Sequence, residues 1–337
     1  MKTVSACILL GPDEPLFQKC LKSVSIWVDE VIVINSDPEY MPRLNDKRNI
    51  KYFNRPFDDF ASARNYSIGQ SNSDYIFIID SDEILERSQI KPIKYLLGQS
   101  FEVIYMKQKS KVGKHYTEVT QPRLFKNVPS IYYNRPVHNE LKFGSDRMIC
   151  YSDIRIMHYG YDLGLKQVKK QERTLSMLED IKNPDTFDLY NLMTTHAGMK
   201  NWEEAIETGL QVLSSFKLEK PRGLDHVELM TLNTLATAYL KERQDPYAAA
   251  QWCIQLLEKD PNYLDGLYTY AWCFFLTSQF DGCIEILNTF DYIQAQTLKN
   301  PDNYSNMVIN KLYTSSKELR ELVQSEQKEE ELEDCSV

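Results

Sequence analysis

Short apolar runs alternate with amphipathic stretches over the first third of the chain. Segments 3–10 (TVSACILL), 30–36 (EVIVINS) and 49–55 (NIKYFNR) are short and rich in β-branched residues, which predicts three β-strands. Between the first two, apolar residues recur at helical spacing from Leu16 to Val24. Strand, helix and strand in this order predict a βαβ unit with parallel strands and a right-handed crossover.

The next helix and strand lead into a group of acidic residues. Segment 59–71 (DFASARNYSIGQS) predicts a helix that Asp59 caps at its N-terminus. Segment 75–79 (YIFII) then predicts a strand buried on both faces. It runs directly into Asp80-Ser81-Asp82-Glu83, here called the acidic segment. Because ligands of open α/β sheets bind beyond the carboxyl ends of the strands, we expect a site at the acidic segment.

The pattern changes twice in the rest of the chain. Residues 101–161 are rich in aromatic and β-branched residues with turn residues between them, which predicts antiparallel or edge strands. From about Asp162 onward the spacing is helical nearly throughout. The pattern therefore predicts an α/β domain over 1–165, an all-α domain over 166–320 and an acidic, frayed tail over 321–337.

The helical region contains a repeated pattern. Three segments, 196–213, 237–257 and 271–287, each give a helix, a short polar turn, an aromatic residue and a small residue three positions later. The aromatic and small pairs are Trp202/Ala205, Tyr247/Ala250 and Phe280/Cys283. This pattern, with a period near 34 residues, resembles tetratricopeptide helical hairpins. An irregular helical bundle is the alternative.

Composition narrows the class of protein. The chain has 42% hydrophobic and 26% charged residues, as ordinary globular proteins have, and its net charge of −9 argues against nucleic-acid binding. The 7 cysteines form no C-x-x-C pair, which favours reduced, buried thiols over disulfides. The N-terminus fits a strand better than a signal peptide, and no stretch is long and apolar enough for a membrane span. These features predict a cytoplasmic protein.

Asp80 and Asp82 are the first candidates for chemistry. Alternation at a strand end would turn both carboxylates toward one pocket, with Ser81 pointing away. Such oxygen ligands suit Mg²⁺ or Mn²⁺, which commonly share substrate phosphates. Taken alone, however, the D-x-D pattern is common and favours a turn in which Asp82 or Glu83 caps a following helix.

Segment 57–83 (FDDFASARNYSIGQSNSDYIFIIDSDE) favours the metal interpretation, since it resembles the signature of family 2 glycosyltransferases with a GT-A fold. That signature is F-x-x-A-R-N on a helix, followed by an apolar strand that ends in D-x-D-E. Segments 121–127 (QPRLFKN), 133–141 (YNRPVHNEL) and 155–161 (RIMHYGY) resemble the subgroup that carries tetratricopeptide repeats behind the catalytic domain. The bacterial peptide S-glycosyltransferases that act on glycocins such as sublancin belong to this subgroup.

The resemblance implies a Rossmann-like, mostly parallel GT-A domain followed by a tetratricopeptide-like helical domain. It implies an inverting, metal-dependent hexosyltransferase that uses a nucleotide-diphosphate sugar, first of all a UDP-sugar, and Mn²⁺ or Mg²⁺. The first acceptor to consider is a peptide Cys or Ser side chain bound across the helical repeats, ahead of a cell-surface glycan. The oligomeric state stays open, with a homodimer as one option. The alternative is a partner-binding scaffold whose glycosyltransferase domain is inactive.

The resemblance also implies roles for single residues. Asp82 would be the principal metal ligand and part of the catalytic centre, with Asp80 near the ribose or the metal. His158 would complete the metal or diphosphate site, although a hydrogen-bonded histidine at a domain junction fits as well. Arg64 would lie near the diphosphate or brace the acidic segment, unless it is a surface pairing residue. His138 would be an acceptor-side catalytic candidate.

Several positions depart from the family pattern. Glu140 is a candidate for the general base, but Asn139 stands where the pattern has its glutamate. Asn35 replaces an aspartate expected to touch the nucleobase, and Asp37 could compensate. Donor-binding positions further include Leu10, Asp13 (or Glu14 in its place) and Ser81. These departures leave the base and the sugar of the donor open.

Overall fold

The computed structural model describes residues 2–12, 14–37, 39, 49–112, 115–159, 164–218, 225–299 and 309–334. The chain divides into two compact units, Met1–Arg173 and Thr174–Val337. The division falls inside helix α4 (Gly164–Glu179), the helix in which the sequence-based boundary after residue 165 also lies. Each unit is described by itself below.

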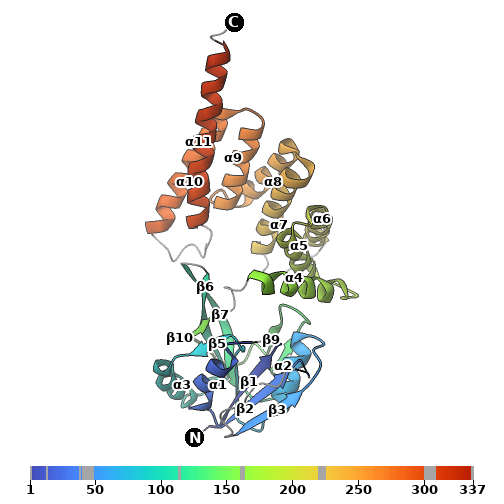
Figure 1. The fold of residues 1–337 in the computed structure, drawn as a ribbon, viewed down its shortest axis with the longest axis vertical. Helices are drawn as coiled ribbons and strands as arrows, with labels where there is room; N and C mark the ends of the chain where they lie inside the picture. The colour runs from blue at the N-terminus through green and yellow to red at the C-terminus, as the bar shows by residue number, and fades with distance from the viewer. Residues whose placement is uncertain are drawn as a thin grey trace. The chain divides into compact units, whose positions relative to one another are not determined.

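A mixed β-sheet forms the centre of unit 1 (Figure 1). Its described strands follow the order β3-β2-β1-β4-β7-β6-β10-β5. Strands β1 to β4 run parallel, β7 runs antiparallel to β4 and β6, and β10 runs parallel to β6. Short β5 closes the edge, antiparallel to β10. The bounds are β1 Val4–Leu10, β2 Glu30–Asn35, β3 Ile50–Asn54, β4 Tyr75–Ile78, β5 Glu83–Leu85, β6 Val103–Val112, β7 His115–Lys126 and β10 Ile149–His158.

The predicted elements of the first 80 residues are confirmed. Three strands lie where the β-branched runs are, and α1 (Phe17–Ser25) joins the first two. Helix α2 (Phe60–Gly69) begins after Asp59, whose carboxylate accepts the N–H of Ser62 at 2.8 Å. Strand β4 is buried throughout, as predicted, with a parallel neighbour on one side and an antiparallel neighbour on the other.

Both faces of the sheet are covered. Because side chains alternate along a strand, Ala6 and Ile8 of β1 join the core on one face and Cys7 joins the core on the other. Helices α1 and α3 (Ile90–Leu97) cover the first face. Helix α2 and a hairpin of β8 (Tyr132–Asn134) and β9 (Glu140–Lys142) cover the second. The polar residues described below lie at the edge where β1, β2 and β4 end.

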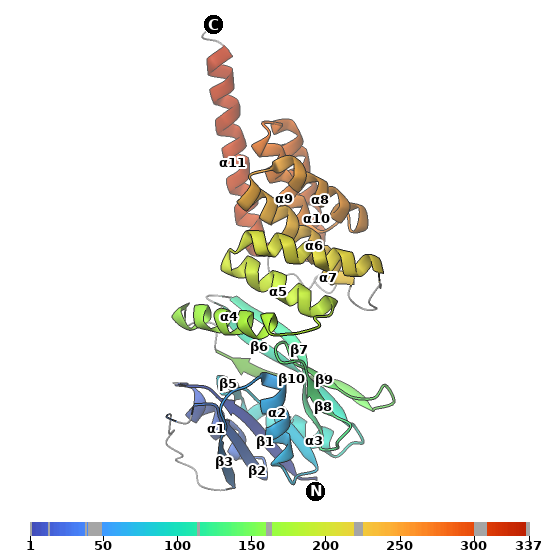
Figure 2. The same cartoon turned by 90° about the vertical axis from the view of Figure 1, so that its right-hand side faces the viewer.

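Unit 2 consists of helices that pack in successive pairs, α5 with α6, α7 with α8, and α9 with α10 (Figure 2). This confirms the predicted helical hairpins. A π-helical turn, Tyr239–Arg243, follows α7. The bounds are α5 Thr186–Met199, α6 Trp202–Leu218, α7 Asp225–Ala238, α8 Pro246–Lys259, α9 Leu264–Leu276, α10 Phe280–Lys299 and α11 Ile309–Asp334.

The second predicted pair, Tyr247/Ala250, is out of register by one residue. Tyr247 is 68% exposed, and Ala249 rather than Ala250 is the fully buried small residue. The reason is that Asp245 caps the helix and Pro246 takes its first position. The first residues of α8 and α10 are then separated by the roughly 34-residue period of such hairpins.

Helix α11 occupies much of the segment predicted as a frayed tail. It is helical through Asp334, and Leu319 and Val323 pack fully buried against α9 and α10. The described cysteines (Cys7, Cys20, Cys150, Cys253, Cys273 and Cys283) are free thiols. Of the helices that the structure describes, none is both long and apolar enough to cross a bilayer.

Candidate active site

The acidic segment forms a turn rather than a continuation of β4. The strand ends at Ile78, and the N–H of Glu83 donates to the carbonyl of Asp80 at 2.9 Å. In return, the N–H of Asp80 donates to Oε2 of Glu83 at 2.8 Å. The prediction that strand alternation orients Asp80 and Asp82 is therefore wrong, because the turn orients them. Neither Asp82 nor Glu83 caps a helix, since a 3₁₀ turn begins only at Arg87.

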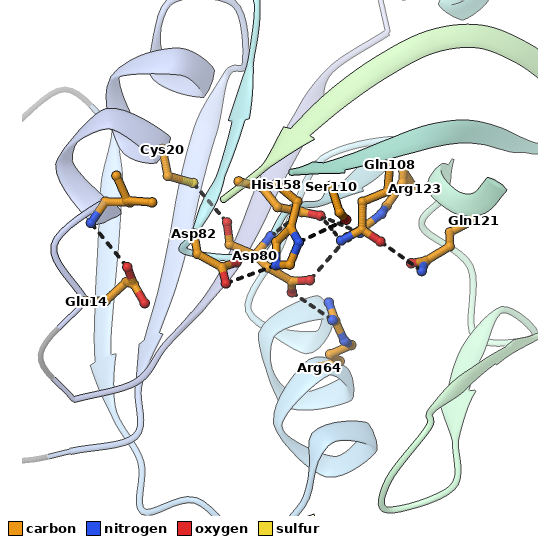
Figure 3. A network of polar contacts seen from close by, with 12 residues as sticks. Glu14, Cys20, Arg64, Asp80, Asp82, Gln108, Ser110, Gln121, Arg123 and His158 are labelled. Carbon is orange, nitrogen blue, oxygen red and sulfur yellow. Dashed lines mark hydrogen bonds and ion pairs between the residues drawn. The ribbon is translucent and has the colours of Figure 1, made fainter. Parts of the chain in front are cut away.

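Two arginines hold the acidic segment (Figure 3). Nη2 of Arg64 lies 2.8 Å from Oδ1 of Asp80, and Nη1 of Arg123 lies 3.6 Å from Oδ2. Nη2 of Arg123 also pairs with Oε1 of Glu83 at 2.7 Å. The side chains of Arg123 and Glu83 are only 3% and 0% exposed. The four charges alternate in sign, which compensates for the cost of taking them out of water.

This arrangement sets the protonation of the two carboxyls in opposite directions. Burial alone would raise the pKa of Asp80, but the charges of Arg64 and Arg123 outweigh it and hold that pKa well below its usual range. Burial raises the pKa of Glu83, assisted by the negative charge of Asp80 and opposed by Arg123. Asp80 is thus a permanent carboxylate, fixed in place by its two guanidinium partners.

Asp82 pairs with His158 instead. Nε2 of His158 lies 3.1 Å from Oδ2 of Asp82, and its Nδ1 lies 3.1 Å from the hydroxyl of Ser110. Strand pairing places these groups, because His158 is opposite Ser110 on β6 and opposite Glu83 on β5. Burial disfavours the imidazolium, but the hydrogen bond and charge of Asp82, with Glu83 and Asp80, raise the pKa of His158.

The donor-side positions at the ends of β1 and β2 lie together. The carbonyl of Leu10 accepts both the N–H and the hydroxyl of Ser36, each at 2.9 Å. Asn35, paired with Leu10 across the strands, donates from Nδ2 to Oδ1 of Asn54 at 3.0 Å and to the carbonyl of Asp37 at 2.5 Å. The amide of Asn35 therefore has partners within the protein.

The remaining candidates lie in other places. Asp13 lies outside the described residues, and the carboxylate of Glu14 accepts the N–H of Leu16 at 3.2 Å, just before α1. Ser81 is buried within the acidic segment. His138 is exposed in the loop between β8 and β9. Glu140 is half exposed at the start of β9, where its carboxylate pairs with Lys142 at 2.7 Å.

Sequence reasoning missed the polar side chains that β6 and β7 contribute. Besides Arg123, Gln108 donates to Oε1 of Glu83 at 2.8 Å, and Gln121 donates to Oε1 of Gln108 at 3.1 Å. The one signal in the sequence was a charged residue, Arg123, directly before the apolar pair Leu124-Phe125 of a buried strand. A buried arginine calls for a carboxylate partner.

Comparison with known proteins finds a family match in the N-terminal unit and a relative among curated proteins. Residues 12–154 match the model of the family described as glycosyl transferase family 2. A TPR repeat-containing protein of Synechococcus elongatus is 28% identical over an alignment of 194 residues, which covers 53% of this chain and 48% of that protein. The chain thus spans about half of the length of that relative.

Solved structures resemble each part of the chain. S. aureus TarS 1-349 covers 80% of this chain and 90% of its own, with a TM-score of 0.39 and 11% identity. A complex of the same protein with UDP-GlcNAc gives a TM-score of 0.38 and 12% identity over the same shares. The TPR2B domain of yeast Sti1, in a complex with pHsp70, covers 40% of this chain and 98% of its own, with a TM-score of 0.30 and 16% identity.

All three TM-scores lie below 0.5, so the description of the two units rests on the family match and on the order of the helices and strands. Most of the N-terminal unit thus matches the glycosyl transferase family 2 model and has a mixed, largely parallel sheet, and a unit of helical hairpins follows it in the chain.

Proposed function

We propose that this protein is a glycosyltransferase that moves a sugar from a nucleotide-diphosphate sugar, first of all a UDP-sugar, to an acceptor with inversion at the anomeric carbon. The observation that carries the proposal is the acidic segment at the carboxyl edge of a family 2 sheet, with Asp82 and His158 in contact there. Ligands of open α/β sheets bind at this edge.

The residues present fit a divalent cation in part. Among the described residues there is no group of three or more His, Cys, Asp or Glu side chains that could hold a metal. Asp82 and His158 supply a carboxylate and an imidazole, which suit Mn²⁺ and are compatible with Mg²⁺ that keeps waters and phosphate oxygens. Ser110 holds the second ring nitrogen, as outer partners of metal-bound histidines do. Asp80, engaged by two arginines, fits a supporting role better.

Each group of residues would have one task. A bound divalent cation neutralises negative charge that develops on a leaving diphosphate. Asp82 and His158 would hold it, and Arg64 and Arg123 would keep the acidic segment in place. Asn35 and Asp37 would face the nucleobase. His138 or Glu140 would take the proton from the acceptor as its oxygen or sulfur attacks the anomeric carbon and the diphosphate leaves.

The acceptor is proposed to be a peptide Cys or Ser side chain, ahead of a glycan. The support is the helical unit, because stacked helical hairpins offer extended surfaces that suit an extended chain. A cytoplasmic location and the oligomeric state remain predictions from the sequence.

A screen of nucleotide sugars with Mn²⁺, read as released nucleoside diphosphate, tests the activity. We expect turnover of a UDP-sugar, and a decrease of about 100-fold in Asp82→Asn, as for loss of an electrostatic group in other enzymes. Asp153→Asn is the matched control, because this exposed aspartate pairs only with Lys107 among the contacts described. Absence of turnover with every donor would overturn the proposal.

A scaffold with an inactive domain is the second candidate. The hydrogen bonds of Asn35 to Asn54 and Asp37 favour it, because they occupy the amide that would read a nucleobase. Calorimetry with UDP and Mn²⁺ separates the two candidates. Heat of binding that disappears in Asp82→Asn supports the enzyme, and no heat with the wild-type protein supports the scaffold.

A further inference from the structure

Two consecutive residues of helix α2, Arg64 and Asn65, contact two different parts of unit 1, the acidic segment and strand β8. Arg64 pairs with Asp80 in the acidic segment. Asn65 contacts the backbone of Tyr133 in β8 twice, since its Nδ2 donates to the carbonyl at 2.8 Å and its Oδ1 accepts the N–H at 2.8 Å. The guanidinium of Arg64 also lies 5.2 Å from the centre of the Tyr133 ring, within the range of a cation–π contact.

The hairpin that Asn65 holds carries a strained loop. Arg135 and His138, which begin and end the loop segment 135–138, have φ angles of 73° and 49°. Non-glycine residues rarely adopt such left-handed conformations, and they persist where the surrounding structure fixes them. Such positions cluster at active sites and ligand clamps, so the loop is a candidate for contact with substrate.

Three further contacts fix this loop. The carbonyl of Pro136 accepts the N–H of Phe60, a donor of the first turn of α2 that has no partner within the helix. Val137 and Leu141 are each 5% exposed and anchor the loop and β9 in the core. His138 is exposed between these anchors. Helix α2 is therefore the element that contacts both the acidic segment and the loop.

We propose that Asn65 is a positioning residue that fixes loop 135–138 relative to the acidic segment, so that His138 is presented to the acceptor side of the reaction. The inference rests on the proposed function, because the acceptor side is defined by it. Asn65 touches no reacting atom and acts through the backbone of Tyr133. Arg64 and Asn65 then have complementary tasks, one toward the donor side and one toward the acceptor side.

Asn65→Ala and Asn65→Asp test the inference in the full-length protein. Aspartate keeps the size and the acceptor oxygen but cannot donate to the Tyr133 carbonyl, so both variants lose that bond. We expect hydrogen exchange in residues 132–142 to become at least about tenfold faster, and exchange in 75–85 to stay unchanged. For the UDP-sugar turned over fastest in the screen, kcat should fall about tenfold while KM and the Kd for UDP with Mn²⁺ stay within about twofold.

Asn127→Ala is the matched control. Its Nδ2 donates to the carbonyl of Ser73 at 3.0 Å, so it too joins two segments through a side-chain amide, at the amino end of β4. We expect Asn127→Ala to lower the Tm about as much as Asn65→Ala does. Its hydrogen exchange in residues 132–142 and its kcat should stay close to those of the wild-type protein. The inference is overturned if Asn65→Ala leaves that exchange unchanged, or lowers kcat no more than Asn127→Ala does. Failure of the proposed function differs, because the wild-type protein itself would then neither bind UDP nor turn over a donor.

Discussion

Asp80 and Asp82 are two positions apart, yet their carboxylates have different surroundings. Asp80 accepts from Arg64 and lies within ion-pair distance of Arg123, both of which are largely buried. Asp82 contacts the ring of His158 and is 23% exposed. Removing the charge of a side chain with buried ion-pair partners leaves those partners uncompensated. Replacement of Asp80 should therefore lower the free energy of unfolding more than replacement of Asp82.

We expect Asp80→Asn to lower the free energy of unfolding by about 2 kcal/mol. A broken buried ion pair costs about 3–5 kcal/mol, and water screens part of the loss here because the Asp80 side chain is 35% exposed. Asp82→Asn should cost less than about 1 kcal/mol, the value of one hydrogen bond, and should abolish stabilisation by Mn²⁺ with UDP. Thermal unfolding with and without these ligands measures both effects. Equal losses in the two variants would contradict the assignment.

The candidate site could be predicted from local patterns only where its residues are close in the sequence, and the distant His158 was placed there by the family resemblance alone. Asp80, Asp82 and Arg64 lie within one helix–strand unit, so a short pattern in the chain was enough to group them. Arg123, Gln108 and Ser110 come from strands whose pairing with β4 and β10 joins distant segments. Register between distant strands depends on core packing, and a single sequence does not display it.

At the scale of elements, short apolar runs were sufficient to predict the parallel strands, and apolar residues at helical spacing were sufficient to predict the helical hairpins. This spacing was not sufficient to predict the first residue of helix α8. The sequence pattern placed Tyr247 in the position of the aromatic residue that begins the second helix of the hairpin. In the structure, Asp245 caps helix α8 and Pro246 is its first residue, one position before Tyr247. Capping residues fix a helix start more sharply than apolar spacing does.

Close packing between the hairpins gives a prediction at Gly266 of α9. A Cβ added there would overlap with Cδ2 of the fully buried Leu256 of α8. Alanine would gain up to about 1 kcal/mol of helix propensity, but overpacking costs about 1–3 kcal/mol. We therefore expect Gly266→Ala to destabilise the protein by about 1 kcal/mol in denaturant unfolding.

Gly69 at the end of α2 is the control for this prediction. A Cβ added there would meet nothing within 4 Å, so Gly69→Ala should not lower stability. If Gly266→Ala proved as stable as wild type, Leu256 would have to move without cost, and the contact between α8 and α9 would be looser than described.

At the scale of the whole molecule, the two compact units predict separate responses to ligand. A ligand at 100 times its Kd stabilises the unit that binds it by about 2.7 kcal/mol. UDP with Mn²⁺ should therefore slow hydrogen exchange in residues 75–85 of unit 1, and leave exchange in α9 of unit 2 unchanged. Exchange measured by mass spectrometry checks this, and equal protection of both units would show that they unfold as one.

The row of alternating charges formed by Arg64, Asp80, Arg123 and Glu83 also constrains how this sequence can evolve. Loss of any one member leaves a neighbouring charge of the row uncompensated in a largely dry setting, so a single substitution is selected against even where it touches no substrate. Paired replacements that keep the row neutral are the accessible route. In the descendants of this chain, these four positions should therefore be inherited as a unit, while exposed positions around them drift.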